Sequence, residues 1–301
     1  WEHLPADWPI SGTTGYEFIA SLAEVLVDDE KMDTLRQAWD EVVGKTSDPH
    51  AELRAARRLM VDRNFAGEFA TLLGLANVIA RDEPQQPDEE TLRHALRELL
   101  LAFPVYRTYG TEAGLPPADL RLLQQVIAQV DADAQALDLL TRIMTGAVVN
   151  QAQANSFRTR FQQLTGPLMA KSVEDTLFFR QNMGLALNEV GAEPVPRGFS
   201  LTRFHQEMAT RRERQPDALS GTSTHDTKRG EDARARLYTL TEAPTQWAEG
   251  VARWRQMNQT HVRFLNDGTA PKAADTWMLY QALAGVWPPA LRPDDHAGLK
   301  A

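Results

Sequence analysis

Apolar residues recur every three or four positions through most of the chain between residues 29 and 150, and no strand pattern interrupts them. The first repeat ends at Gly44, a residue that commonly stops a helix, and its apolar positions are Met32, Leu35, Trp39, Val42 and Val43. A periodicity of this kind predicts amphipathic helices packed against one another. We therefore expect residues 29–150 to form a helical subdomain.

The later helices of this block are bounded by residues that stop or start helices. Pro49 opens a pattern that continues to Ile79, and the prolines at 84 and 87 then break it. Acidic residues at 88–90 stand where the helix dipole favours negative charge, so a further helix is expected from there to Leu101. More helices are expected at residues 117–130, 134–144 and 152–164.

The sequence on either side of the helical block has a different character. Residues 7–16 are rich in Gly, Thr and Pro and are expected to form a short strand and loop before a helix at 17–27. Residues 218–224 are small and rich in Thr and Ser, and we expect a buried strand there before a helix at 231–240. Short strands that end in polar residues and lead into helices are typical of a (β/α) barrel.

The predicted fold is therefore mainly α, with a helical subdomain inserted into part of a (β/α)8 TIM-type barrel that contributes a few short strands. The expected segments are 1–28 (strand, loop and helix of the barrel), 29–150 (helical insertion), 151–240 (return to the barrel) and 241–301 (helical C-terminal portion).

Composition excludes several classes of protein. The net charge of −9 argues against a nucleic-acid partner, and no apolar run is long enough to span a membrane. The absence of cysteine removes disulfides and thiolate metal ligands, and fits a cytoplasmic location. The histidines show no metal-ligand spacing and no phosphate-binding glycine loop is present, so neither a metal ion nor a cofactor is expected. No signal peptide is visible at Trp1.

The stretch with the most chemical content is residues 221–232, which contains His225 and Asp226. It places a histidine and a carboxylate where a strand is expected to meet a loop, the usual position of a barrel's active site. A purely structural role is the alternative, in which Asp226 caps the following helix. A serine triad with Ser223 is excluded, because near-contiguous side chains on an extended backbone diverge.

Two further segments are candidates for a binding site. A Gly-Pro pair at 166–167 is expected to interrupt the helix and to bring Lys171, Glu174 and Asp175 to the start of a new helix. Acids at that position also stabilise a helix without any function. Tyr16, which follows Gly15, is either a platform for a sugar ring or a core residue.

These segments together resemble the maltooligosyl trehalose synthases of the α-amylase family of glycoside hydrolases. The stretches that carry the resemblance occur in the family's order and cover the chain from end to end; they are residues 4–18, 165–176, 187–191 and 222–232. The departures are small: Ser172, Phe179 and Gly230 stand where the family often has Gly, Tyr and Ser. None of them removes an ionisable catalytic group.

The resemblance implies an enzyme that converts the reducing-end α-1,4 bond of a maltooligosaccharide into an α,α-1,1 bond by intramolecular transglucosylation, with retention of configuration. Asp226 matches the carboxylate that stabilises the transition state. The family's nucleophile and general acid precede the position of Trp1, so the chain alone is expected to have little or no activity and to need the missing N-terminal part as a partner. The implied substrate-binding residues are Tyr16, Lys171, Glu174, Asp175, His225, Lys228 and Arg229.

Two other functions remain open at this stage. A related α-glucan hydrolase or glucanotransferase would use Asp226 in the same role. A non-catalytic helical interaction module would fit the helix content and the missing carboxylates.

Overall fold

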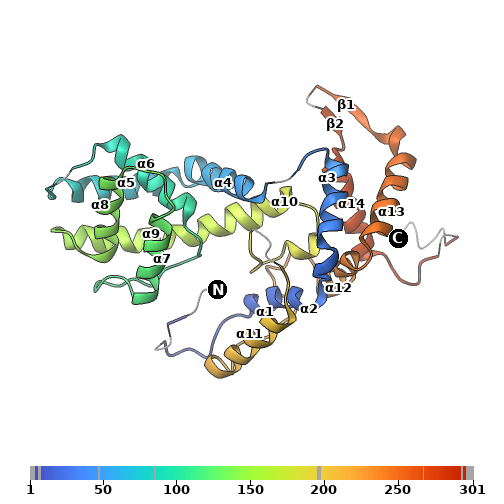
Figure 1. Ribbon diagram of the computed structural model, residues 1–301, viewed down its shortest axis with the longest axis horizontal. Helices are drawn as coiled ribbons and strands as arrows, with labels where there is room; N and C mark the ends of the chain where they lie inside the picture. The colour runs from blue at the N-terminus through green and yellow to red at the C-terminus, as the bar shows by residue number, and fades with distance from the viewer. Residues whose placement is uncertain are drawn as a thin grey trace. The chain divides into compact units, whose positions relative to one another are not determined.

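The computed structural model describes residues 4–5, 8–46, 48–84, 86–194, 198–266, 268–292 and 294–295. This part of the chain is mainly helical, and its one sheet is a two-stranded antiparallel hairpin (Figure 1). The chain divides into two compact units, which we name by their place in the sequence. The central unit comprises Trp1–Trp8 and His50–Leu177, and the flanking unit comprises Pro9–Pro49 and Phe178–Ala301.

The central unit is built from helices joined by short loops. Their bounds are α4 (Pro49–Leu59), the π-helical turn η2 (Met60–Asn64), α5 (Ala66–Ala80), α6 (Glu89–Ala102), α7 (Pro117–Ile127), α8 (Ala134–Thr145), α9 (Gln151–Ser172) and the π-helical turn η3 (Val173–Leu177). These helices agree with the periodicity of residues 49–164, and no described residue between 29 and 150 lies in a strand. Asp88 caps α6 as its position suggests, because its side chain accepts the backbone N–H of Thr91 at 2.9 Å.

One apolar core holds the central unit together. Helix α5 is apolar around most of its circumference and packs against α6, α8 and α9. The side chains of Leu92, Leu96 and Leu99 on α6 are fully buried in this core. Phe103 and Phe161 meet edge to face, with ring centroids 5.1 Å apart.

The flanking unit is assembled from the two ends of the sequence. Its elements are α1 (Tyr16–Ser21), α2 (Ala23–Leu26), η1 (Asp29–Lys31), α3 (Met32–Val43), α10 (Phe178–Arg180), η4 (Leu185–Leu187), α11 (Leu201–Arg214), α12 (Glu231–Tyr238), η5 (Thr239–Thr241), α13 (Pro244–Met257), η6 (Gln259–His261), β1 (Arg263–Leu265), β2 (Gly268–Ala270) and α14 (Ala273–Val286). The hairpin β1–β2 pairs Arg263 with Ala270.

A cluster of tryptophans forms the centre of the flanking unit. Trp277 of α14 is fully buried, and its ring centroid lies 5.6 Å from that of Trp39 on α3 and 5.9 Å from that of Trp247 on α13. Its indole N–H donates to the carbonyl of Met183 at 3.0 Å, so the polar atom of the buried ring is satisfied. The helix predicted at 32–43 therefore belongs to this core.

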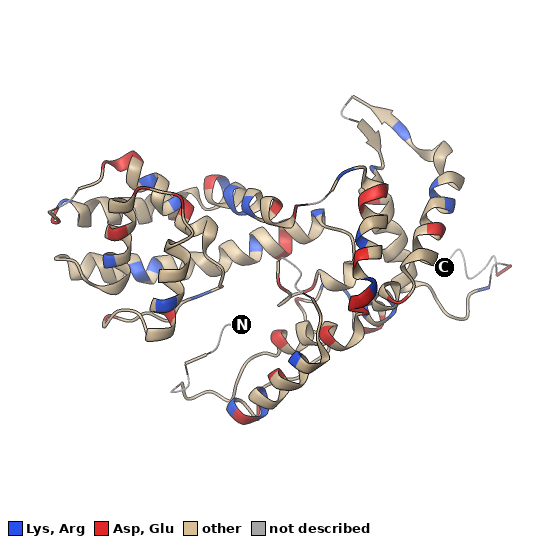
Figure 2. Cartoon of the chain, in the orientation of Figure 1, with Lys and Arg blue, Asp and Glu red and all other residues tan. Residues whose placement is uncertain are grey.

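Ion pairs attach α11 to the first two helices. Figure 2 shows acidic positions on α1 and α2 beside basic positions of α11. Arg203 binds the buried carboxylate of Glu24 at 2.6 Å, and Arg211 pairs with Glu17. These pairs hold the segment 201–214 against residues that precede it by almost two hundred positions.

The strands expected at residues 8–14 and 218–224 are absent from the described chain, so that prediction was wrong. A backbone segment becomes a strand when its N–H and C=O groups pair in a ladder with a neighbour. These two segments lie beside each other, but the bond described between their backbones is Leu219 N–H to the carbonyl of Thr13 at 3.3 Å. The (β/α)8 barrel stays a prediction.

The compact units also follow borders that the sequence did not indicate. The division falls at residues 8/9, 49/50 and 177/178, whereas the predicted segments meet at 28/29, 150/151 and 240/241. The reasons are that α3 packs into the tryptophan cluster and that α9, which begins at Gln151, packs into the core of the central unit. The four-part division of the chain stays a prediction. None of the described helices is long and apolar enough to cross a membrane.

Replacement of Leu96 by Ala tests the core of the central unit. Leu96 is 0% exposed, so Leu96→Ala should lower the free energy of unfolding by about 2–5 kcal/mol through lost burial and a cavity. The control is Val78→Ala on α5, whose side chain is 40% exposed and whose loss should cost about 0.5 kcal/mol or less. Chemical denaturation followed by circular dichroism measures both, and equal losses would contradict this core.

Candidate active site

His225 and Asp226 lie in a tight turn before α12. The turn is closed by threonines: Thr227 N–H donates to the carbonyl of Thr224 at 3.2 Å, and Asp226 N–H donates to the Thr224 hydroxyl at 3.2 Å. The side chain of His225 is 86% exposed and that of Asp226 is 50% exposed. The expectation that these residues follow a strand was wrong, but their display on a polar loop is as expected.

Asp226 does not cap α12. The N-cap residue of that helix is Gly230, which has no side chain to offer. The Asp226 carboxylate instead accepts a hydrogen bond from the hydroxyl of Tyr16, the first residue of α1. The imidazole Nε2 of His225 lies 3.5 Å from the same carboxylate oxygen. The helix-cap alternative is therefore excluded for Asp226.

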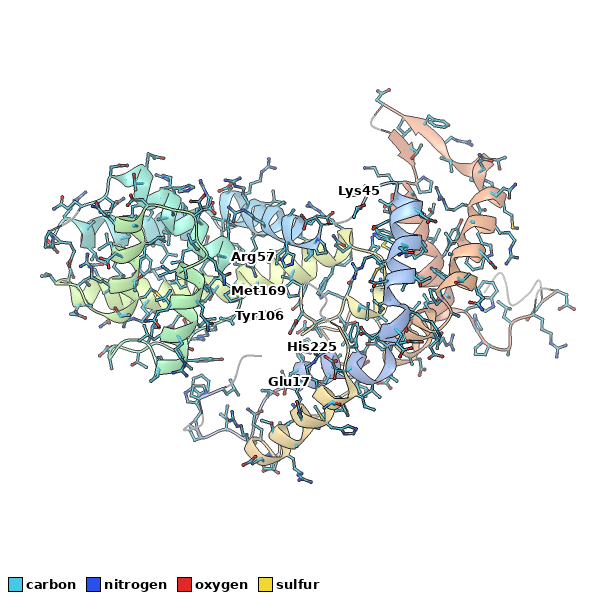
Figure 3. The ribbon with its side chains drawn as sticks, viewed as in Figure 1. Glu17, Lys45, Arg57, Tyr106, Met169 and His225 are labelled. Carbon is cyan, nitrogen blue, oxygen red and sulfur yellow. The ribbon has the colours of Figure 1, made fainter. Side chains whose placement is uncertain are left out.

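The surroundings of Tyr16 match neither a pure core residue nor a fully exposed platform for a sugar ring. Its side chain is partly exposed rather than buried in a core, and its hydroxyl is directed to Asp226. Glu17 follows Tyr16 in the sequence and His225 precedes Asp226. Figure 3 labels these two residues and shows them close together, in agreement with the Tyr16–Asp226 hydrogen bond. A tyrosine held in this way can orient a carboxylate and still present part of its ring.

Glycines allow the segment before α1 to touch the segment before the turn. A Cβ at Gly15 would lie 2.4 Å from the carbonyl oxygen of Leu219, and one at Gly12 would lie 2.4 Å from the Cβ of Ala218. Both glycines also have positive φ angles, 89° and 146°, which side chains disfavour. A third glycine, Gly191, has φ 79°, and its Cβ would lie 2.7 Å from the carbonyl oxygen of Tyr16.

Residues 12–18, 187–191 and 222–229 therefore meet in the flanking unit, although they are far apart in the sequence. The structure brings together Tyr16, His225, Asp226, Lys228 and Arg229 from the predicted site. The Lys228 ammonium donates to the backbone carbonyl of Asp226 at 3.5 Å, which keeps this side chain beside the turn.

A buried carboxylate that the sequence did not single out lies under the turn. Glu189 is 3% exposed and accepts the backbone N–H groups of Lys228 at 2.8 Å and Arg229 at 3.2 Å. The Arg234 guanidinium of α12 lies 3.9 Å from Glu189. An acid placed between Leu187 and Val190 was the available signal, since a charge within an apolar run suggests a buried and paired group.

Burial also changes the acidity of two side chains near this carboxylate. It lowers the pKa of the Arg229 guanidinium, while the charge of Glu189 raises it. Burial raises the pKa of the Tyr238 phenol on α12, against the charge of Arg234.

Lys171, Glu174 and Asp175 belong to the central unit. The break expected at 166–167 is absent, because both residues lie inside α9, and the acids follow in η3. Pro167 lacks one helical hydrogen bond, but Leu164 and Leu168 anchor this part of α9 in the core. Lys171 pairs with Asp175 at 2.6 Å, and the hydroxyl of Tyr106 donates to Glu174. That these residues face the same cavity as Asp226 stays a prediction.

Arg57 lies buried in the central unit and donates to the carbonyl of Leu101 at 2.7 Å and to the sulfur of Met169 at 3.4 Å (Figure 3). Burial lowers the pKa of its guanidinium to about 10.

A cavity of about 610 Å³ lies in the central unit between residues 110–112 and one face of α9, and no residue of the predicted site lines it. The described residues contain no group of three or more His, Cys, Asp or Glu that could hold a metal ion.

Comparison with known proteins gives clear relatives, although no family model matches the chain. A curated protein of Mycobacterium tuberculosis (strain CDC 1551 / Oshkosh), provisionally named maltooligosyl trehalose synthase, is 30% identical over 95% of this chain and 34% of its own length. The structure of maltooligosyltrehalose synthase from Arthrobacter ramosus is 28% identical with a TM-score of 0.76, and the match covers 95% of this chain and 34% of that one. A solved glycosyltrehalose synthase is 26% identical with a TM-score of 0.69, over 95% of this chain and 33% of that one.

The resemblance found in the sequence is therefore confirmed, and the chain spans about a third of the length of the relatives that it matches.

Two glycine substitutions separate the close approach at Gly15 from the effect of a positive φ alone. Gly44 ends α3 with φ 74° and has open space around it, so Gly44→Ala should cost about 1–2 kcal/mol of stability. Gly15→Ala adds a clash with Leu219 to a similar φ, and should cost about 1–3 kcal/mol more. Denaturation curves of the two variants give the difference, and equal losses would show that the segments do not touch.

Proposed function

We propose that the chain is part of an enzyme that converts the reducing-end α-1,4 bond of a maltooligosaccharide into an α,α-1,1 bond, because it matches about a third of the length of maltooligosyl trehalose synthases. The observation that carries this proposal is the display of Asp226 on a closed turn with Tyr16 and His225 beside it. The match to the relatives covers 95% of the chain, this turn included.

Asp226 is proposed as the transition-state stabiliser. A reaction of this type passes through a transition state with positive charge on the sugar ring. A fixed carboxylate beside that ring lowers the energy of the transition state more than that of the neutral substrate. The hydrogen bond from Tyr16 fixes the orientation of the Asp226 carboxylate, which this role needs.

The neighbouring side chains are proposed to bind the substrate. His225 is highly exposed and carries ring nitrogens that can donate to a sugar hydroxyl. Lys228 and Arg229 add donors on the same turn. We further propose that Lys171, Glu174 and Asp175 contact the reducing-end glucose. This glucose must stay bound and rotate after the bond is broken, because an attacking water in its place would give hydrolysis.

The chain by itself is proposed to be inactive. Retention of configuration needs a nucleophile and a general acid on opposite sides of the bond, and the resemblance locates both outside these residues. A cytoplasmic location also stays a prediction, based on the absence of cysteine.

The product formed from maltopentaose tests the function. The chain can replace the matching third of the Arthrobacter ramosus enzyme, and the chimera and the isolated chain are each incubated with maltopentaose. A non-reducing oligosaccharide from the chimera supports the synthase, whereas glucose or shorter maltodextrins support a hydrolase or glucanotransferase. A folded chimera without activity or maltooligosaccharide binding would support the interaction module. The isolated chain should form no product.

Asp226→Asn in the active chimera keeps the shape of the side chain and removes its charge. Turnover should fall by about 10²–10³-fold, in kcat and kcat/KM together, because the lost interaction is made mainly in the transition state. Steady-state kinetics and the melting temperature of the same variant are measured. Asp217→Asn, on an exposed part of the flanking unit, is the control and should turn over normally. Normal turnover with a lowered melting temperature in Asp226→Asn would make Asp226 a structural residue.

A further inference from the structure

A buried ion pair lies directly beneath the turn that carries His225 and Asp226. The side chains of Glu189 and Arg234 are 3% and 2% exposed, and Arg234 Nε lies 3.9 Å from the Glu189 carboxylate. A buried ion pair seldom stabilises a fold more than apolar side chains of the same size would, because both charges lose their hydration. What distinguishes this pair is that both partners also form hydrogen bonds to the backbone of the turn.

Glu189 holds the end of the turn. One carboxylate oxygen accepts the backbone N–H of Lys228 at 2.8 Å, and the other accepts that of Lys228 at 3.1 Å and that of Arg229 at 3.2 Å. It also accepts the N–H of Val190, its own neighbour, at 2.8 Å. A carboxylate that binds consecutive N–H groups prevents that stretch of backbone from rotating.

Arg234 holds both sides of the same turn. Its guanidinium donates to the carbonyl of Thr222 and to the Ser223 hydroxyl at 3.3 Å, on the side before His225. Its Nε donates to the carbonyl of Arg229 at 3.2 Å, on the side after Asp226. The planar guanidinium can make these bonds together, which a lysine could not do with the same geometry.

None of the described residues of the turn lies in a strand in this chain. The ion pair anchors the backbone of the turn from two elements: Glu189 lies in the segment that follows η4, and Arg234 lies on α12. Asp226 lies between the anchored positions, two residues before Lys228 and three before Arg229. A shift of about 1 Å in a group that acts on the transition state can cost on the order of 10²-fold in rate.

We propose that Glu189 and Arg234 are positioning residues for Asp226: they clamp residues 222–229 so that its carboxylate keeps one place relative to the reacting sugar. This rests on the proposed function, because the clamp matters for catalysis only if Asp226 acts there. Neither side chain contacts the substrate in this role.

Amide hydrogen exchange in the 301-residue chain tests the clamp without any activity. Glu189→Gln should speed exchange of the Lys228 and Arg229 amides by about tenfold or more, because their acceptor loses its charge. The matched control is Glu24→Gln, which alters another buried carboxylate of the flanking unit that binds an arginine, Arg203, and a backbone N–H. In the control, exchange at Lys228 and Arg229 should stay within about twofold.

Equal exchange at Lys228 and Arg229 in the two variants would overturn the clamp. If Glu189→Gln does not fold, Arg234→Lys takes its place, since it keeps the charge and loses the fork of donors. Faster exchange at Lys228 and Arg229 is again the expected result.

Kinetics in the chimera give a readout that a merely structural pair would not move. Glu189→Gln and Arg234→Lys should lower kcat by about tenfold or more while KM changes by about twofold or less. Glu24→Gln should leave both near the value of the parent. An unchanged kcat with faster exchange would overturn the positioning role. A parent chimera that forms no non-reducing product contradicts the proposed function instead, whereas the exchange experiment still decides whether the clamp exists.

Discussion

The close approach of backbones in the flanking unit is the constraint on which the arrangement of the candidate site depends. Gly15 brings the start of α1 against Leu219, and Gly191 brings a second loop against Tyr16. A side chain at either position would clash with a carbonyl oxygen, and a loop cannot move away without giving up its own hydrogen bonds. The meeting of Tyr16 with Asp226 follows from these contacts, because the two residues belong to the segments that the glycines join.

Polar groups at this site are organised in two levels. The exposed level contains His225 and the carboxylate of Asp226, which solvent can reach. The buried level contains Glu189 and Arg234, whose hydrogen bonds go to the backbone of the turn. Under the proposed function, this arrangement separates the carboxylate that acts on the substrate from the side chains that hold the backbone of its turn.

The helices were largely predictable because each depends on local pattern. The repeat from Met32 ends at Gly44 in the structure as in the prediction, and Asp88 caps α6. Predictions failed where a local signal competed with packing. The pair at 166–167 suggested a break, yet α9 continues through Pro167, since buried leucines on both sides outweigh one missing hydrogen bond. The prediction of strands at 8–14 and 218–224 was wrong because a strand requires a paired neighbour, which a local pattern cannot supply.

The sequence by itself determined the helical character of residues 29–150, the polar loop that carries His225 and Asp226, and the resemblance to maltooligosyl trehalose synthases. These are properties of residue types and spacings along the chain. The tertiary structure alone decided that Tyr16 binds Asp226, that Glu189 and Arg234 lie beneath the turn, and that α3 packs with Trp277 in the flanking unit. Contacts between residues that are far apart in the sequence, 210 positions in the case of Tyr16 and Asp226, depend on how the whole unit packs, and no local pattern encodes them.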